Sequence, residues 1–239
     1  MKYSIIVSIF VFLFLNACNP DVNTNQKNIK NQSSKKMKNT PLDDLINLIK
    51  KANADREKYI KRFDEEPEDQ YGILAFKELG WADEKGEKVA EDSERSNRYR
   101  KNVYSALYTI DTNQLKTVSK IIMSAEKEQD LFNTISLHQG KINDTIVDLY
   151  SKKDTLNKLE ISDIEKLKNL FEKILFIKKD VSDSFNQLLL DYKNDKNNII
   201  QTNSDELKSY LTKLHKKLIE KETETDKLKE EISSLMKKL

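Results

Sequence analysis

The sequence predicts an all-α protein, a helical bundle of about six or seven helices with a long C-terminal helix, after a disordered N-terminal tether. Charged residues make up 34% of the 239 residues, and the chain holds only 4 glycines and 3 prolines. Because sandwiches and barrels need glycine and proline in their many turns, this composition favours long helices with solvated faces. From residue 41 onward, apolar residues also recur at steps of three and four, the spacing of one helical face.

Residues 1–17 are predicted to be a signal peptide. The apolar run from Ile5 to Leu15 follows a single lysine, and it is shorter than the roughly 20 residues that a membrane-spanning helix needs. A short basic start, an apolar core and a small residue before the cleavage point are typical of a secretory signal. The order Leu-Asn-Ala-Cys that ends at Cys18 also resembles a bacterial lipobox, in which the cysteine is diacylated and anchors the protein to the membrane. The alternative is an incidental cysteine in an uncleaved anchor.

Residues 18–40 are predicted to form a lipidated flexible tether. They are mostly Asn, Lys, Gln, Ser and Thr, with too few apolar residues to bury against anything. An ordered extension packed on the domain is the alternative. Residues 41–239 are then expected to form a single all-helical domain. The formal net charge of +2 predicts no preference for nucleic acid.

The first part of the domain is expected to hold three helices. The first begins at Pro41, which suits a first helical turn, and is ended by the Glu-Glu-Pro run at 65–67. A short second helix covers 71–79, and Gly80 is expected to end it in the left-handed conformation, with Trp81 folded onto the core. The alternative is that Trp81 is an exposed aromatic anchor. A third helix spans about 94–110.

The following helices show clearer start signals. Asp111 is expected to cap a helix that continues to about residue 125, and another covers 131–149, weakened at Gly140. Ser162 and Glu165 form a capping-box pair before a helix that runs to about residue 192.

The final helix begins near Ser204 and carries a heptad seam with steps of four and three. Its polar members are Lys221 and Thr225. A helix of this length is about 50 Å long at 1.5 Å per residue, so part of the seam is expected to extend beyond a small bundle. The seam either packs against its own bundle or forms a homodimer with a second copy. The apolar members are Leu207, Leu211, Leu214, Leu218, Leu228, Ile232 and Leu235.

No catalytic or metal site is predicted, and no cofactor is expected. His138 and His215 each lack a second His or Cys at ligand spacing, and both are expected at the surface or at its boundary. The chain has no phosphate-binding glycine loop, no G-x-S-x-G and no H-E-x-x-H. The sequence therefore indicates that the protein is not an enzyme.

A basic aromatic cluster lies in the stretch SERSNRYRKNVY. The favoured interpretation is an ordinary solvated helix face, and the alternative is a patch that docks an acidic protein surface or a sulfated polysaccharide. Its members are Arg95, Arg98, Tyr99, Arg100 and Lys101.

The stretches ILAFKELGW and SNRYRKNVYSALY, with the Asn/Lys-rich tether and the lipobox, resemble the virulent-strain-associated outer-surface lipoproteins of Borrelia spirochaetes. This paralogous group includes the complement-regulator-acquiring surface proteins. The resemblance implies an all-helical domain displayed on the bacterial outer membrane. It also implies binding of a host protein for complement evasion, by capture of a regulator or inhibition of terminal components. The alternative it implies is an adhesin for a tick-gut or host extracellular-matrix receptor. No ligand-contact residue is carried over, because functions differ within the group.

Overall fold

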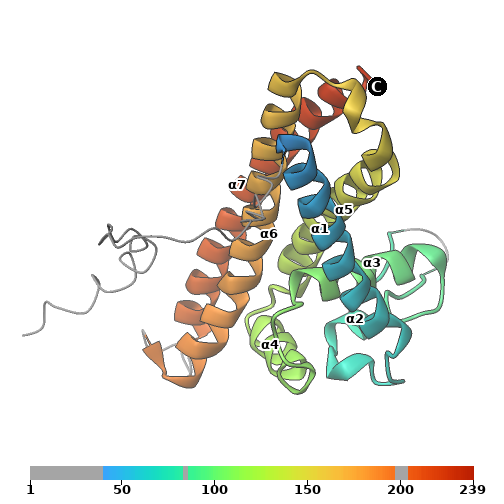
Figure 1. Cartoon of the computed structure of the whole chain (residues 1–239). Coiled ribbons are helices and arrows are strands. Elements are labelled where there is room, and N and C mark those ends of the chain that lie inside the picture. The colour runs from blue at the N-terminus through green and yellow to red at the C-terminus, as the bar shows by residue number, and fades with distance from the viewer. Residues whose placement is uncertain (1–39, 83–85, 197–203) are drawn as a thin grey trace, which may run out of the picture. The chain divides into compact units, whose positions relative to one another are not determined.

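A computed structural model describes residues 40–82, 86–196 and 204–239, which belong to one compact unit, Asn39–Leu239 (Figure 1). These residues form helices and no strand; the one β-bridge joins Gly80 to Lys88. The all-α prediction is therefore confirmed. The helices are α1 (Pro41–Asp64), η1 (Gln70–Gly72), α2 (Ala75–Glu78), α3 (Glu94–Ala106), α4 (Thr112–Ser124), α5 (Glu128–Lys152), η2 (Lys153–Lys158), α6 (Ile161–Lys193) and α7 (Ser204–Met236).

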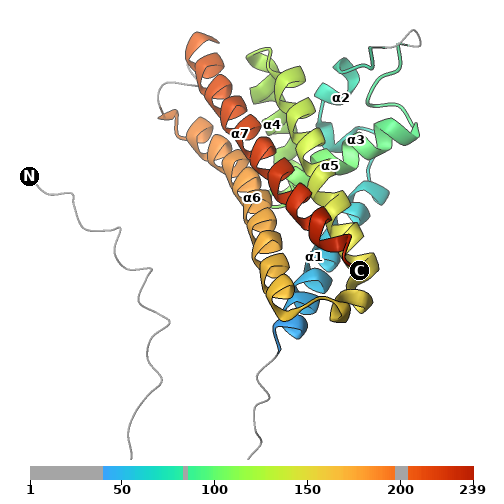
Figure 2. The same cartoon turned by 90° about the horizontal axis from the view of Figure 1, so that it is seen from above.

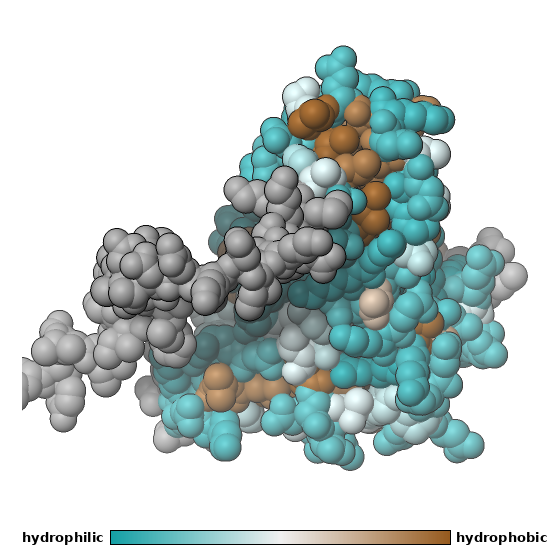
Figure 3. All heavy atoms as spheres, in the orientation of Figure 1, coloured by the Kyte–Doolittle hydropathy of each residue, from teal (hydrophilic) through white to brown (hydrophobic). Residues whose placement is uncertain are grey.

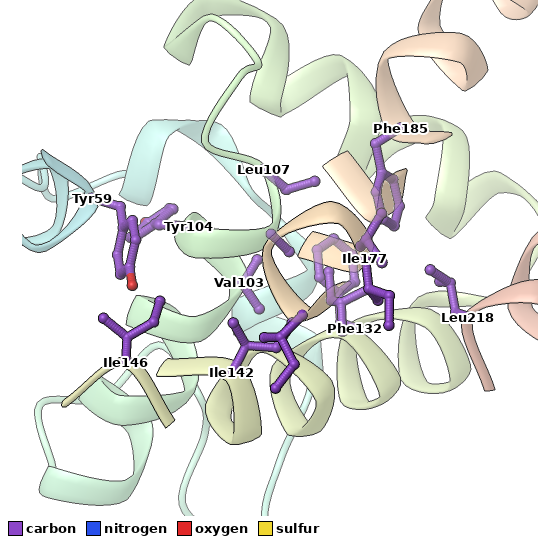
Figure 4. Close-up of a cluster of buried hydrophobic side chains, with 14 of the residues drawn as sticks. Tyr59, Val103, Tyr104, Leu107, Phe132, Ile142, Ile146, Ile177, Phe185 and Leu218 are labelled. Atoms are coloured by element: carbon purple, nitrogen blue, oxygen red, sulfur yellow. The ribbon is translucent and has the colours of Figure 1, made fainter. Parts of the chain in front are cut away.

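Helix α5 lies at the centre of this unit, where it packs against α1, α3, α4, α6 and α7. Side chains of five helices meet in one apolar core (Figure 4). Each of those labelled in Figure 4 is at most 3% exposed, and burying a side chain of this size contributes about 1.5–3 kcal/mol. By contrast, the face in Figure 3 is mostly hydrophilic, with apolar side chains in separate places.

Helices α6 and α7 lie side by side and antiparallel (Figures 1 and 2). Near one end, Lys238 Nζ lies 2.8 Å from a carboxylate oxygen of Asp163. Near the other, the Tyr210 hydroxyl donates to Asp191 at 2.9 Å. Because α6 and α7 have the same length of 33 residues, α6 covers its partner from end to end.

Helix α1 begins with a capping box. The Thr40 hydroxyl accepts from the Asp43 N–H at 3.2 Å, and the Asp43 carboxylate accepts from the Thr40 N–H at 3.1 Å. Pro41 occupies the first turn, as predicted. At the start of α4, the predicted Asp111 cap is confirmed, since its carboxylate accepts from the Asn113 N–H at 2.8 Å.

The predicted helix over 71–79 is wrong in its first half and at its end. Gln70, Tyr71 and Gly72 all have positive φ, between 53° and 72°, so the chain turns sharply before the single turn of α2. The helix then passes into the extended residue Leu79. Gly80 is not left-handed; its backbone lies in the bridge to the segment after residue 85.

Two other boundaries differ from the prediction. Helix α3 ends at Ala106 rather than near residue 110. Just after this end, the Arg62 guanidinium of α1 donates to the carbonyls of Leu107 and Tyr108 at 3.2 and 3.3 Å. Ser162 does not cap α6. It lies inside the helix, which begins after Glu160, and no side chain caps that end.

Candidate functional site

An open groove of about 760 Å³ lies between α5, α3 and the chain around α2. We call it the α3–α5 groove. Another hollow, near the C-terminal end of α7, is smaller, at about 210 Å³. The apolar side chains along the α3–α5 groove include Leu79, Trp81, Val89, Tyr99 and Leu137. Of these, Leu137 is 62% exposed, so it is the apolar side chain that the groove presents most openly to solvent.

Trp81 is held in one orientation at the edge of the groove. Its backbone N–H donates to the Glu87 carbonyl at 2.9 Å, and its indole N–H donates to the Ser96 hydroxyl, also at 2.9 Å. The Arg95 guanidinium lies 4.9 Å from the indole centroid, and the Tyr99 ring meets it edge-on at 5.9 Å. Four contacts from two segments therefore make the indole a fixed wall of the groove.

The carboxylate of Glu87 ties this segment to α3. It accepts from the Arg95 guanidinium at 2.6 Å and from the hydroxyls of Ser93 and Ser96. The Arg95 and Ser93 hydrogen bonds lower the pKa of Glu87 to about 2. Glu87 is therefore ionised at any physiological pH, and the loop stays attached to the start of α3.

Gly140 lets α3 approach α5 at the floor of the groove. A Cβ at this position would lie 2.9 Å from Nδ2 of Asn102, which is closer than real contacts allow. The Asn102 Oδ1 accepts from Asn143 Nδ2 at 3.0 Å. A glycine inside a helix costs about 1 kcal/mol relative to alanine, and here it makes room for the Asn102 amide.

The structure separates the five residues of the predicted basic aromatic cluster. Arg95, Arg98 and Tyr99 lie along the α3–α5 groove, although Tyr99 is only 7% exposed. Arg100 is 4% exposed, and Lys101 points to the other side of α3, with its Nζ 4.5 Å from the centroid of the Phe63 ring. The five side chains therefore do not form one exposed patch, because successive residues of a helix point about 100° apart.

The buried Arg100 side chain is held by contacts within the protein. It pairs with Glu66, with Nε and Oε2 3.1 Å apart, and donates to the carbonyls of Val89 and Glu91 at 2.6 and 2.9 Å. Desolvation raises the pKa of Glu66 against the opposing effects of Tyr104 and Arg100. Arg100 thus holds two loops against α3 and is not available to a partner.

The C-terminal seam is buried within the chain, against α5 and α6. Its predicted extension beyond the bundle is wrong, because those helices are long enough to cover it. A homodimer through α7 would have to use the opposite face of the helix. The exposed fractions are 6% for Leu207, 0% for Leu211, 8% for Leu214, 1% for Leu218, 7% for Leu228, 3% for Ile232 and 5% for Leu235.

Thr225, one of the two polar members of the seam, has a buried partner. Its Oγ1 lies 2.8 Å from Nε2 of His138 on α5, and neither residue is exposed. The prediction that His138 lies at the surface is therefore wrong, whereas His215 is half-buried, with Nε2 2.9 Å from the Thr134 hydroxyl. The neighbours of His138 in the chain, Leu137 and Gln139, gave no signal of this burial, although Gln139 is itself buried.

Three further observations concern chemistry and location. Over 40–82, 86–196 and 204–239 there is no group of three or more His, Cys, Asp or Glu side chains that could hold a metal ion. In the same residues, no helix is long and apolar enough to cross a membrane. Cys18, the predicted lipid attachment point, and the predicted tether to residue 39 lie outside the described residues.

The fold and the groove define the class of this protein, an all-helical bundle with an open surface groove between two of its helices. The chain belongs to the family described as Borrelia Bbcrasp-1 domain containing protein, whose model matches residues 61–237. The family resemblance inferred from the sequence is therefore confirmed.

Solved structures of Borrelia proteins share the fold. BSE31 of Borrelia spielmanii is 51% identical, with a TM-score of 0.79 over 81% of this chain and 97% of that chain. The outer surface protein BBA65 of Borrelia burgdorferi is 19% identical, with a TM-score of 0.65 over 81% and 98%. The outer surface lipoprotein BBA64 of the same species is 19% identical, with a TM-score of 0.58 over 83% and 93%. No curated protein matches the chain.

Proposed function

We propose that this chain is a lipid-anchored outer-surface protein that binds a host protein, without enzymatic activity, and serves complement evasion. Membership of the Bbcrasp-1 family supports a surface protein, and the order Leu-Asn-Ala-Cys at Cys18 supports the lipid anchor. The main observation in favour of a binding role is the α3–α5 groove, with its exposed Leu137 and fixed Trp81. Tryptophan is enriched among the residues that contribute most to binding, and concave sites lined by apolar side chains are where partners commonly bind.

Binding is tested with the compact unit Asn39–Leu239 immobilised against purified factor H, plasminogen and the terminal complement components. We expect saturable binding of one of them. Leu137→Asp should weaken that binding at least about tenfold, because it places a charge in the apolar part of the groove. The matched control is Phe176→Asp on α6, which replaces an equally exposed apolar residue outside the groove.

No binding to any complement protein would refute the complement proposal. The same experiment tests the adhesin alternative, if tick-gut extract and extracellular-matrix proteins are also passed over the immobilised protein. Equal loss of binding by Leu137→Asp and Phe176→Asp would mean that the groove is not the contact site.

The lipid anchor has its own test. Cells that express the whole chain are grown with radiolabelled palmitate. We expect the label on the wild-type chain and none on the Cys18→Ala variant, which should also leave the membrane fraction. Equal labelling of both chains would contradict lipidation at Cys18.

A further inference from the structure

The cationic and the anionic side chains that line the α3–α5 groove differ in how they are paired. Its three cationic side chains are all engaged with carboxylates: Arg95 with Glu87, Arg98 with Asp144, and Lys141 with both Glu222 and Asp226. Asp144 is the one groove carboxylate that is paired in this way. The other two belong to Glu78 and Glu128, and neither has an ion pair in the part of the chain that the structure describes.

Glu128 is the more constrained of these two. Its Oε2 is buried and has no hydrogen-bond partner, although the residue lies along the groove at the start of α5. A buried carboxylate oxygen without a donor is costly, and a donor supplied by a ligand would remove that cost. The carboxylate of Glu128 therefore favours a ligand that carries a cation at this point, and it disfavours anionic ligands such as fatty acids.

Two amide side chains in the groove offer donors. Asn102 is 9% exposed, its Oδ1 accepts from Asn143 Nδ2, and its Nδ2 has no acceptor in the described part of the chain. Asn133 is arranged in the same way: its Oδ1 accepts from the Tyr99 hydroxyl at 2.9 Å, and its Nδ2 has no acceptor among the described residues. Because the N–H groups of both amides have no acceptor among the described residues, they are available to carbonyl oxygens of a ligand.

We propose that the α3–α5 groove binds an extended segment of a partner polypeptide in which a lysine or arginine neighbours an apolar residue. The apolar side chain lies between Trp81 and Leu137, and the basic side chain pairs with Glu128. The backbone carbonyls of the segment accept from Asn102 and Asn133. A volume of about 760 Å³ is sufficient for a short segment of this kind. This inference rests on the proposed binding function and specifies the chemistry of the partner.

The chain supplies its own probe, because Trp81 is its only tryptophan and lies in the groove. Wild-type protein is titrated with a blocked synthetic peptide that holds one lysine between two leucines, and Trp81 emission is recorded. A second peptide has glutamate in place of the lysine, and a third has serines in place of the leucines. We expect saturable change with the first peptide and binding at least about fivefold weaker with the other two.

Glu128→Gln keeps the shape of the side chain and removes its charge. This change should weaken binding of the lysine peptide about fivefold, so that the lysine peptide no longer binds more tightly than the glutamate peptide. The matched control is Glu165→Gln on α6, an exposed glutamate on a helix that contributes nothing to the groove. Far-UV circular dichroism of both variants confirms that they are folded.

Several outcomes would overturn the inference. They are no saturable change of Trp81 emission with the lysine peptide, equal binding of the lysine and glutamate peptides, and no effect of Glu128→Gln. If a host protein binds the chain but is neither displaced by the lysine peptide nor affected by Glu128→Gln, this inference fails while the proposed function stands. If the peptide binds as expected and no host protein does, the proposed function fails instead.

Discussion

His138 shows how a single residue links two helices. Its Nε2 lies 2.8 Å from the Thr225 hydroxyl on α7, and its Nδ1 is buried with no hydrogen-bond partner in the described residues. Burial, with Lys141 and Lys221 nearby, lowers the pKa of His138 to about 4 against the opposing effect of Asp226. The imidazole is therefore neutral in the folded protein at neutral pH.

This pKa predicts acid sensitivity. The folded-state value of about 4 lies below the ordinary 6.5, so the unfolded chain takes up the proton first as the pH falls. The contribution of the neutral His138 to the free energy of unfolding is fully present above about pH 6.5 and is lost as the pH falls toward 4. Between pH 7 and pH 5, the free energy of unfolding should fall by about 2 kcal/mol more in the wild type than in His138→Gln. Urea unfolding at both pH values measures this, and parallel curves for the two proteins would contradict it.

Arg98 and Arg100 are two residues apart and have opposite roles. Arg100 is buried with Glu66, whereas the Arg98 side chain is 66% exposed and pairs with Asp144 at the rim of the groove. Removing one partner of a buried ion pair leaves an uncompensated charge, which typically costs about 3–5 kcal/mol. An exposed pair contributes less than about 1 kcal/mol.

We therefore expect Arg100→Ala to destabilise the protein by about 3–5 kcal/mol and Arg98→Ala by less than about 1 kcal/mol. Chemical denaturation of the two variants under the same conditions is the measurement. A similar loss of stability from both changes would mean that Arg100 does not hold the two loops against α3.

At the scale of elements, periodicity predicted the long helices well and the short ones poorly. The seam of α7 and the Asp111 cap of α4 followed from spacing alone, because each depends on neighbours along the chain. The helix over 71–79 and the end of α3 did not, because they depend on distant groups. The Arg62 guanidinium that binds the Leu107 and Tyr108 carbonyls comes from α1, 45 residues away in the first case.

The α7 seam gives a prediction with a neighbouring control. Leu218 is 1% exposed and Ile219 is 44% exposed. Leu218→Ala should cost about 2–5 kcal/mol, because it leaves a cavity against α5 and α6. Ile219→Ala should cost less than about 1 kcal/mol. Thermal unfolding measures both, and light scattering should show the same molar mass for all three proteins. A mass change with Leu218→Ala would support an intermolecular seam instead.

For the described unit as a whole, one core joins the long helices. Side chains of α1, α3, α5, α6 and α7 belong to the same apolar cluster, and Trp81 packs against it from the segment after α2. No part of this unit has a separate core among the described residues. A unit of this kind is expected to unfold cooperatively.

Cooperative unfolding is directly testable. Trp81 fluorescence reports on the region around α2, and far-UV circular dichroism reports on all helices. We expect the two urea transitions to coincide for the compact unit Asn39–Leu239. Separate midpoints would show that the region around α2 and α3 unfolds independently of α5, α6 and α7.

The sequence by itself determined the all-helical class, the family and the residues of the α7 seam. Those properties depend on composition, local periodicity and short motifs. Only the tertiary structure decided that the seam is covered by α5 and α6, that Arg100 is buried, and that His138 meets Thr225. It also decided that Asn102, Glu128 and Leu137 share one groove with Trp81. These pairings join residues far apart in the chain, and helix periodicity fixes which face a residue occupies but not which helix covers that face.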